Sequence, residues 1–188
     1  IYPILSYENL VKPVEVPLEE DFSYNLERMK NFITSRTKIL ILCNPNNPTG
    51  TYIKKDDLEK FLKEIPEDLL IISDEAYFEY VEEEDFGTCF PYIEKKNVII
   101  VRTFSKIYGL AGLRIGYGIA KKEIIQILEK IRPPFNTTNL AQEAALAALE
   151  DQEYVKFSFM NNSREKKYLF NQLKKLGIQC YPTQANFI

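Results

Sequence analysis

The sequence contains no histidine, so it lacks the side chain that most often transfers protons near neutral pH. A serine–histidine–aspartate triad is therefore excluded. Most zinc chemistry is excluded with it, because imidazole is a principal zinc ligand. Any catalysis by this chain has to use lysine, carboxylate, tyrosine or hydroxyl groups.

Cysteine is also scarce. The three cysteines, Cys43, Cys89 and Cys180, lie far apart in the sequence and include no C-x-x-C pair. This pattern predicts buried thiols in a reducing compartment rather than a disulfide framework or a metal site. We therefore expect a cytoplasmic protein.

Long apolar runs and a strong charge bias are missing as well. No stretch reaches the roughly 18 consecutive apolar residues of a membrane span, and no basic-then-apolar leader opens the sequence. The net charge is -3 at pH 7 with both signs interspersed, which favours small-molecule partners over nucleic acid or a membrane. The sequence starts without methionine and stops within the apolar run "ANFI", so we expect an internal fragment of a longer protein.

Three short apolar runs, at 39–42, 69–72 and 98–101, predict the centre of the fold. They do not alternate with polar residues, which is typical of parallel strands covered on both faces. Residues 54–65, between the first two runs, have apolar residues at helical spacing. A fourth candidate strand, at 112–120, follows the third too closely for a helical crossover and is expected to pair antiparallel. The pattern predicts an α/β fold.

Helical patterns dominate the later part of the chain. "EIIQILEKI" predicts one helix, and "NLAQEAALAAL" predicts another with Asn139 as its N-cap. A long polar helix is expected from 153 to 176, ended by Gly177. Its inward-facing residues are expected to be Val155, Phe159, Leu169, Leu173 and Leu176. Residues 178–188 resemble strand material, and the acidic run at 79–85 is interpreted as a solvated loop.

Unusual polar residues follow each of the three apolar runs. The first run continues into "CNPNNPTG", the second into "SDEAY" and the third into "RTFSK". The carboxyl ends of parallel strands meet at one edge of an open sheet, where ligands of such folds bind. We expect Asn47, Asp74, Tyr77 and Lys106 to meet there.

One ligand, pyridoxal phosphate, has a use for all of these groups. Lys106 supplies an amine for the cofactor aldehyde, and Asp74 supplies a carboxylate that keeps the ring nitrogen protonated. Asn47 and Tyr77 donate to the phenolic oxygen of the ring. The sequence thus provides a partner for each reactive atom of the ring.

The phosphate group of this cofactor needs hydroxyl and cationic partners. Thr103 and Ser105 lie just before Lys106, and Arg114 follows it. An arginine fork on a phosphate is a charge-assisted contact worth about 1.5–3 kcal/mol. We expect these three residues to hold the phosphate.

Each of these residues also has an ordinary structural interpretation when taken alone. Asp74 can cap a helix, and Tyr77 can pack in the core. Lys106 can be a solvated loop lysine, and Arg114 can belong to a surface ion pair. A serine–lysine hydrolase is disfavoured because Ser105 and Lys106 are adjacent, so their side chains diverge. The order of the groups and their places at strand ends favour the cofactor site.

The chain resembles the class I/II pyridoxal-phosphate aminotransferases, and within that family the members that act on histidinol phosphate. The resemblance lies in "CNPNNPTG", "SDEAY", "RTFSKIYGLAGLRIGY" and "RPPFNTTNLAQEAALAALED", and covers most of residues 16–188. It implies an aspartate-aminotransferase-like large domain: a three-layer α/β/α sandwich whose mostly parallel sheet carries one antiparallel strand. Residues 1–150 would belong to that cofactor-binding domain. Residues 151–188 would form a connecting helix and the first strand of a small domain.

The same resemblance implies roles for individual residues. The implied catalytic residues are Lys106, Asp74 and Tyr77. The implied cofactor contacts are Asn47, Asp74, Tyr77, Thr103, Ser105, Lys106 and Arg114. Asn186 matches an asparagine near the substrate site. The opening "YPILSYENL" departs from the family pattern for the aromatic residue that stacks on the ring, so the stacking residue, Tyr7 or another, stays open.

The activity implied by the resemblance is transamination between histidinol phosphate and 2-oxoglutarate in histidine biosynthesis, by a homodimer when full length. Another class I/II aminotransferase or an amino-acid-phosphate decarboxylase is the alternative within the cofactor class. A catalytically silent fragment of the fold, acting in binding or assembly, is the alternative outside it.

Overall fold

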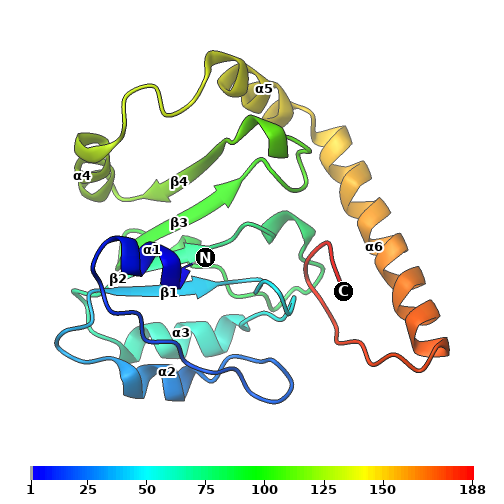
Figure 1. Ribbon diagram of the computed structural model, residues 1–188, viewed down its shortest axis with the longest axis horizontal. Helices are drawn as coiled ribbons and strands as arrows, with labels where there is room; N and C mark the ends of the chain where they lie inside the picture. Colours follow the sequence, from blue (N-terminus) through cyan, green and yellow to red (C-terminus); the bar gives the residue numbers. More distant parts are fainter. Residues whose placement is uncertain (1) are drawn as a thin grey trace.

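A four-stranded mixed sheet lies at the centre of residues 2–188, which the computed structural model describes (Figure 1). Its strands, in spatial order, are β1 (Ile39–Cys43), β2 (Leu70–Asp74), β3 (Asn97–Thr103) and β4 (Gly116–Ala120). β1, β2 and β3 pair in parallel, and β4 pairs antiparallel with β3. The three parallel strands and the antiparallel fourth strand that the sequence predicts are confirmed.

Two helices cover one face of this sheet. They are α2 (Leu26–Phe32) and α3 (Lys55–Glu64), and α3 connects β1 to β2. The apolar residues of α3 recur at helical spacing and are buried, as an amphipathic helix on a sheet requires. The core on this face includes Leu42, Leu58, Leu62, Ile71, Val98 and Ile100.

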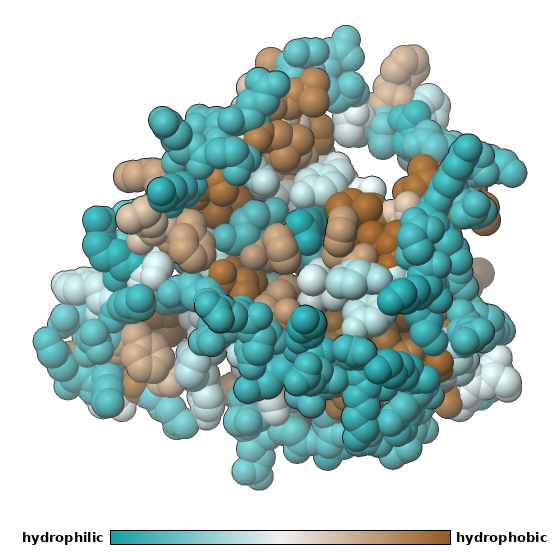
Figure 2. All heavy atoms as spheres, turned by 180° about the vertical axis from the view of Figure 1, so that it is seen from behind, coloured by the Kyte–Doolittle hydropathy of each residue, from teal (hydrophilic) through white to brown (hydrophobic). Residues whose placement is uncertain are grey.

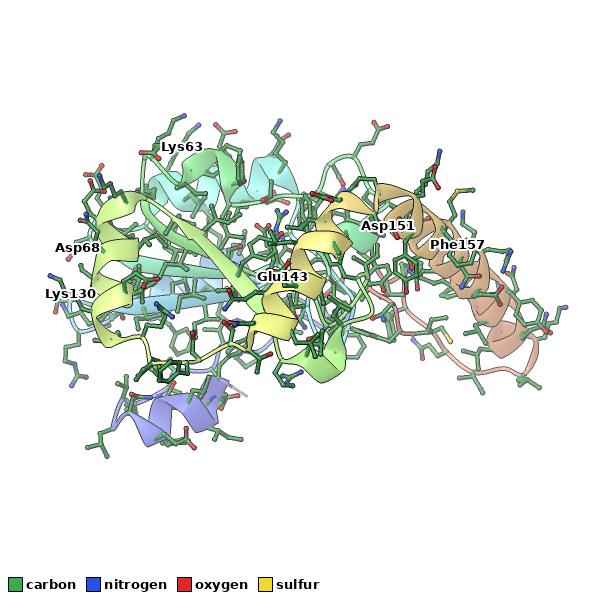
Figure 3. The ribbon with its side chains drawn as sticks, turned by 90° about the horizontal axis from the view of Figure 1, so that it is seen from above. Lys63, Asp68, Lys130, Glu143, Asp151 and Phe157 are labelled. Carbon is green, nitrogen blue, oxygen red and sulfur yellow. The ribbon has the colours of Figure 1, made fainter. Side chains whose placement is uncertain are left out.

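The opposite face of the sheet is less completely covered. A short helix, α1 (Tyr2–Glu8), lies on that side, away from α2 and α3 (Figure 3). Of the strand residues that alternate with the core residues, Ile41, Ile72 and Val101 are half-buried, whereas Cys43 and Ile99 are buried. The prediction that the strands are covered on both faces therefore holds for one face of the described chain and is incomplete for the other.

Two further helices, α4 (Lys122–Ile131) and α5 (Asn139–Glu150), follow β4. The N-cap of α5 is Thr138, whose side-chain oxygen accepts a hydrogen bond from the Ala141 amide at 3.1 Å. The prediction of Asn139 as the cap is wrong by one residue. Threonine and asparagine are both good caps, so "TTN" offers competing choices. Ala141 is buried in a cluster with Phe104 and Ile115, which is consistent with the observed start of the helix.

The longest helix, α6 (Gln152–Lys175), begins directly after α5. Val155 and Phe159 pack inward as predicted. Leu169 and Leu176 are 49% and 74% exposed, so the inward orientation predicted for them is wrong. No helix in the described part of the chain, the 24-residue α6 included, is apolar enough to cross a membrane.

The segment after α6 forms no strand. Gly177 ends the helix with a φ of +73°, as predicted, but residues 178–188 turn back toward the loop after β1. Their backbone groups bond to loops and side chains instead of to a neighbouring strand: the Gln184 amide donates to the Gly50 carbonyl (2.8 Å), and Lys166 donates to the Thr183 carbonyl (2.9 Å). The predicted strand is therefore wrong, while the domain division near residue 150 stays a prediction.

Large apolar side chains are exposed on α4, on α5 and on the loop between them. Ile131 is 74% exposed, Phe135 98% and Leu140 70%. Figure 2 shows apolar side chains at the surface, between hydrophilic ones, on the face opposite to that of Figure 1. Exposed apolar surface of this kind is common where one protein surface contacts another.

Candidate functional site

The carboxyl ends of β1, β2 and β3 meet at one edge of the sheet, as the parallel register requires. Asp74 pairs with Val101 in the β2–β3 ladder. The Asn44 amide donates to the Asp74 carbonyl (2.8 Å), and the Glu75 amide donates to the Val101 carbonyl (2.9 Å). The three loops therefore leave the sheet at the same level, and their side chains share one edge.

The Asp74 carboxylate lies at this edge with two hydrogen-bond donors on it. The Tyr2 hydroxyl donates to Oδ2 at 2.6 Å, and the Ala76 amide donates to Oδ1 at 3.1 Å. Burial, with the hydrogen bond to Asp74, holds the pKa of the Tyr2 hydroxyl far above its ordinary value. Tyr2 therefore stays protonated and can keep donating to the carboxylate.

Tyr2 is a site residue that the sequence analysis missed. It lies 72 positions before Asp74, and no local pattern connects an aromatic residue at the start of α1 to a carboxylate at the end of β2. Tyr7, which the sequence left open as an aromatic partner, is 66% exposed. The structure thus brings Tyr2 to the site and leaves Tyr7 at the surface.

Asn47, Tyr77 and Lys106 lie together. Asn47 Nδ2 donates to the Tyr77 hydroxyl at 2.7 Å, and Lys106 Nζ lies 5.0 Å from the centroid of the Tyr77 ring. Tyr77 is buried, and Phe187 meets it edge-on with the centroids 5.3 Å apart. Three strand-end loops therefore converge on one tyrosine, and the Lys106 amine is half-buried above its ring.

Thr103, Ser105 and Arg114 share a corner of the same edge. Thr103 ends β3 opposite Gly116, and its Oγ1 accepts a hydrogen bond from the Ser105 amide at 3.0 Å. Arg114 precedes Gly116 by two residues, so the β3–β4 pairing brings its backbone beside Thr103. Its exposed guanidinium donates to the Ala111 carbonyl at 2.7 Å. The backbones of Thr103, Ser105 and Arg114 therefore lie close together, while the Arg114 side chain bonds to Ala111 in its own loop.

The loop that carries Asn47 is fixed by a different asparagine. Asn44 is buried, donates from Nδ2 to the Gly87 carbonyl (2.7 Å) and accepts from the Ile53 amide (2.8 Å). Asn46 Nδ2 donates to the Thr49 hydroxyl at 2.8 Å. The asparagine-rich turn is therefore held by Asn44, which bonds to residues outside the turn, and by Asn46, which bonds within it, while the exposed Asn47 reaches Tyr77.

The end of the chain forms a further wall beside Tyr77. Ala185 is fully buried in the cluster that contains Tyr77 and Tyr80. The Asn186 side chain lies next to the Tyr80 hydroxyl, whose pKa burial raises to about 12. Asn186 itself is exposed. The structure therefore brings Asn186 near the site: it contacts Tyr80, and Tyr80 lies in the same cluster as Tyr77.

The acidic run at 79–85 is not simply a solvated loop. Glu82 Oε2 accepts from the Ser163 hydroxyl (2.9 Å), and Glu82 pairs with Lys166 of α6 at 2.7 Å. Gln184 Oε1 accepts from the Glu82 amide at 2.7 Å. The solvated interpretation therefore holds for Glu84, which is exposed, but not for Glu82.

Glu79 is a half-buried residue near this edge whose carboxylate has an oxygen left unsatisfied by the described chain. Its Oε1 atom is buried and finds no hydrogen-bond partner among residues 2–188. Burial raises the pKa of the Glu79 carboxyl above its ordinary value, because the backbone hydrogen bond and the Arg102 cation only partly offset the lost hydration. The ionised form of Glu79 therefore lowers the stability of the fold.

Glu79→Gln is expected to raise the free energy of unfolding by about 1 kcal/mol near pH 8. A raised folded-state pKa means that the penalty is full above that pKa and disappears below the unfolded value of about 4.3. Unfolding measured near pH 8 and near pH 4 should show the gain only at the higher pH. Glu84→Gln, on the exposed part of the same run, is the control. Equal gains at both pH values would show that ionisation is not the cause.

The sequence profile of the family described as "Aminotransferase class I and II" matches residues 3–188. The chain belongs to this family. The chain is 46% identical over 175 residues to the histidinol-phosphate aminotransferase of Bacillus velezensis, a match that covers 93% of this chain and 49% of that protein. This chain thus spans about half the length of the curated relatives it matches.

Two solved structures place the fold within the same family. The histidinol-phosphate aminotransferase of Sinorhizobium meliloti in complex with pyridoxal-5'-phosphate superposes with a TM-score of 0.89 and 31% identity, covering 98% of this chain and 51% of that one. The aspartate aminotransferase of Thermus thermophilus with maleate gives 0.88 and 29%, covering 99% and 51%. The predicted α/β/α fold of the aspartate-aminotransferase type, with its mixed sheet, is confirmed.

Proposed function

We propose that this chain forms most of the pyridoxal-phosphate site of a cytoplasmic transaminase in histidine biosynthesis. The reaction converts histidinol phosphate and 2-oxoglutarate into imidazole acetol phosphate and glutamate, so one amino group changes places with one keto oxygen. The observation that carries this proposal is the convergence of Asp74, of the Asn47–Tyr77 pair and of Lys106 on one sheet edge. The relatives named histidinol-phosphate aminotransferase support the choice of substrate.

The chemistry of the donor set fits the ring of this cofactor. The Asp74 carboxylate accepts a 2.6 Å hydrogen bond from an aromatic hydroxyl, so it is oriented to accept from a ring N–H as well. Asn47 Nδ2 and the Tyr77 hydroxyl are 2.7 Å apart, and both can donate to one phenolic oxygen. Lys106 supplies the amine for the aldehyde.

The phosphate partners fit by chemistry and by backbone position. Thr103 and Ser105 offer hydroxyls beside the end of β3, and Arg114 lies across the β3–β4 pair. The Arg114 guanidinium has one NH1 contact, to Ala111, and its remaining N–H groups can reach outward to an anion after rotation of the side chain. We therefore assign the phosphate group to this corner.

The cofactor, when bound, supplies an electron sink for the bonds of the substrate α-carbon. Lys106 Nζ would take the proton from the α-carbon of the amino donor and pass it on in the first half of the reaction, and would deliver a proton to the α-carbon of the keto acceptor in the second half. Asp74 would hold a proton at the ring nitrogen by opposite charge. Tyr77 and Asn47 would orient the ring and donate to its oxygen. Tyr77 and Ala185 are buried in one cluster beside Lys106 and would limit the access of water from that side.

The substrate side of the site is formed by fewer residues of this chain. Asn186 is the proposed substrate contact, because it lies beside Tyr80 at the edge of the Tyr77 cluster. The exposed apolar side chains of α4 and α5 support association of the full-length protein as a homodimer. The boundary near residue 150 is proposed as the start of the link to a small domain.

Another amino-acid aminotransferase is the second candidate. The aspartate aminotransferase of Thermus thermophilus superposes nearly as well as the histidinol-phosphate enzyme of Sinorhizobium meliloti, with TM-scores of 0.88 and 0.89. The fold and the cofactor residues are thus equally compatible with other amino donors. Turnover of histidinol phosphate, phenylalanine and aspartate by the full-length protein separates the candidates. Comparable rates on all three would remove the histidine-pathway assignment and leave the cofactor assignment intact.

The cofactor assignment itself is tested by chemical labelling. The purified protein is mixed with pyridoxal phosphate, reduced with borohydride, digested and analysed by mass spectrometry. A pyridoxyl group at Lys106, absent from a Lys106→Ala variant, is the expected result. Labelling spread over surface lysines, with none at Lys106, would support the catalytically silent alternative instead.

A further inference from the structure

Glu75 is a fully buried charged residue directly behind the proposed site. Its side chain has 0% exposure, and it follows Asp74 in the sequence. Leaving a carboxylate in such a place costs several kcal/mol unless it is paired and hydrogen-bonded. The proposed mechanism gives Glu75 no role, so its burial needs another explanation.

Every oxygen of Glu75 is satisfied by a donor. Oε2 accepts from Arg102 NH2 at 2.7 Å and from Nε at 3.2 Å, a fork held by one guanidinium. Oε1 accepts from Thr88 Oγ1 (2.8 Å), Cys89 N (3.1 Å) and Ser73 Oγ (3.2 Å). Five donors on one carboxylate make a rigid, fully connected network.

Arg102 is held as firmly as its partner. Its side chain is 13% exposed, and its guanidinium carbon lies 3.5 Å from the centroid of the Phe78 ring. A guanidinium over an aromatic face is attracted by the ring and loses rotational freedom. Glu75 and Arg102 therefore form a fixed bridge rather than a transient ion pair.

The bridge joins the two strand ends that carry the proposed site. Glu75 follows Asp74 at the end of β2, and Arg102 precedes Thr103 at the end of β3. Successive side chains of a strand point to opposite faces of a sheet. The bridge thus lies on one face, while Asp74 and Thr103 lie on the other.

We propose that the Glu75–Arg102 bridge is a positioning pair that fixes the distance between Asp74 and the loop from Thr103 to Lys106. This inference rests on the proposed cofactor site and adds to it two residues that do not touch the cofactor. The β2–β3 ladder ends at the Asp74–Val101 pair, and beyond it the Glu75 amide donates to the Val101 carbonyl at 2.9 Å, so the bridge adds a side-chain link just past the last paired residues. Without that link, the ring-nitrogen partner and the phosphate partners move relative to each other, and the cofactor cannot satisfy both.

The first test uses Glu75→Gln, which keeps the shape and removes the charge. The dissociation constant for pyridoxal phosphate, measured by absorbance titration, is expected to rise about tenfold or more, as for other residues that orient contact groups. Glu59→Gln is the control, because Glu59 pairs with Lys63 on the exposed side of α3. An unchanged dissociation constant in Glu75→Gln would overturn the proposal.

A second variant separates positioning from stability. The double replacement Glu75→Gln with Arg102→Met removes both charges of the pair and keeps an oxygen that can accept from Ser73, Thr88 and Cys89, so it should largely preserve folding. We expect its unfolding midpoint to stay near that of the native protein while its dissociation constant stays raised. Recovery of both together would show that the pair is only a folding element and would overturn the proposal.

A third measurement needs no cofactor. Amide hydrogen exchange in the cofactor-free protein should become faster at 74–77 and at 103–107 in Glu75→Gln, with little change in α3. Unchanged exchange in both segments contradicts the positioning role, whether or not the native protein binds pyridoxal phosphate. Absence of binding and of labelling at Lys106 in the native protein would instead contradict the proposed function, so the two failures are distinguishable.

Discussion

Lys106→Ala is expected to lower kcat by about 10³-fold or more, because this substitution removes both the covalent partner of the cofactor and the proton carrier of the reaction. Lys106 is half-buried, with its amine 5.0 Å from the centroid of the Tyr77 ring. Steady-state turnover of the full-length protein with histidinol phosphate and 2-oxoglutarate is the measurement.

Two further variants and one rescue experiment make this result specific. Lys106→Arg keeps the charge but cannot exchange a proton near neutral pH, so it should be as inactive as the alanine variant. Added methylamine should restore part of the activity of Lys106→Ala, because a small amine fits the space of the missing side chain. Lys130→Ala, at the exposed end of α4 (Figure 3), should keep full activity. Activity of Lys106→Ala within about tenfold of the native value would remove Lys106 from the mechanism.

The core of the fold was predictable because its signals are local. Continuous apolar runs identify β1, β2 and β3, and the short connection to β4 identifies an antiparallel partner. Parallel pairing then places the residues after each strand at one edge without any further information. Asn47, Asp74, Tyr77 and Lys106 could be grouped from the sequence for this reason.

The remaining site residues depend on contacts between distant segments. Tyr2 reaches Asp74 only because α1 returns to the less completely covered face of the sheet. Glu75 and Arg102 are ordinary charged residues in the sequence, and only their burial reveals that they form a bridge. Pairing across 27 positions leaves no periodic pattern to detect.

The wrong predictions for residues 178–188 and for α6 also arise because contacts between distant segments cannot be read from local pattern. Residues 178–188 have the composition of a strand, but a strand needs a neighbour, and the described chain offers loops and α6 instead. Leu169 and Leu176 fit a helical stripe, yet a stripe is buried only where another surface meets it. Sequence pattern predicts the capacity to pair or to pack, and tertiary contacts decide its use.

Gly50→Ala is expected to destabilise the protein by about 2–5 kcal/mol, the sum of backbone strain and overpacking. Gly50 has a φ of +71°, and a Cβ built there would lie 1.9 Å from Thr183 Oγ1 and 3.0 Å from Thr183 Cα. Only glycine allows the turn after β1 and the end of the chain to approach this closely. The Gly50 carbonyl also accepts the Gln184 amide at 2.8 Å, so the contact includes backbone on both sides.

Gly50→Ala should also disturb the proposed cofactor site. The turn that contains Gly50 carries Asn47, and the terminal segment that it contacts carries Phe187, which packs against Tyr77. Urea unfolding gives the loss of stability, and absorbance titration should show weaker binding of pyridoxal phosphate in Gly50→Ala. A lower unfolding midpoint with unchanged cofactor affinity would mean that the two segments pack for stability alone.

Two other glycines separate the causes of this loss. Gly177 has a φ of +73° with nothing within 4 Å of an added Cβ, so Gly177→Ala should show only the strain of about 1–2 kcal/mol. Gly112 has open space and no positive φ, so Gly112→Ala should be nearly neutral. In a double-mutant cycle, Thr183→Gly should reduce the damage of Gly50→Ala, since it removes the clashing Cβ and Oγ1 atoms. Equal losses at Gly50 and Gly177, with no coupling to Thr183, would leave backbone strain as the whole effect and the terminal segment without a close contact to the turn.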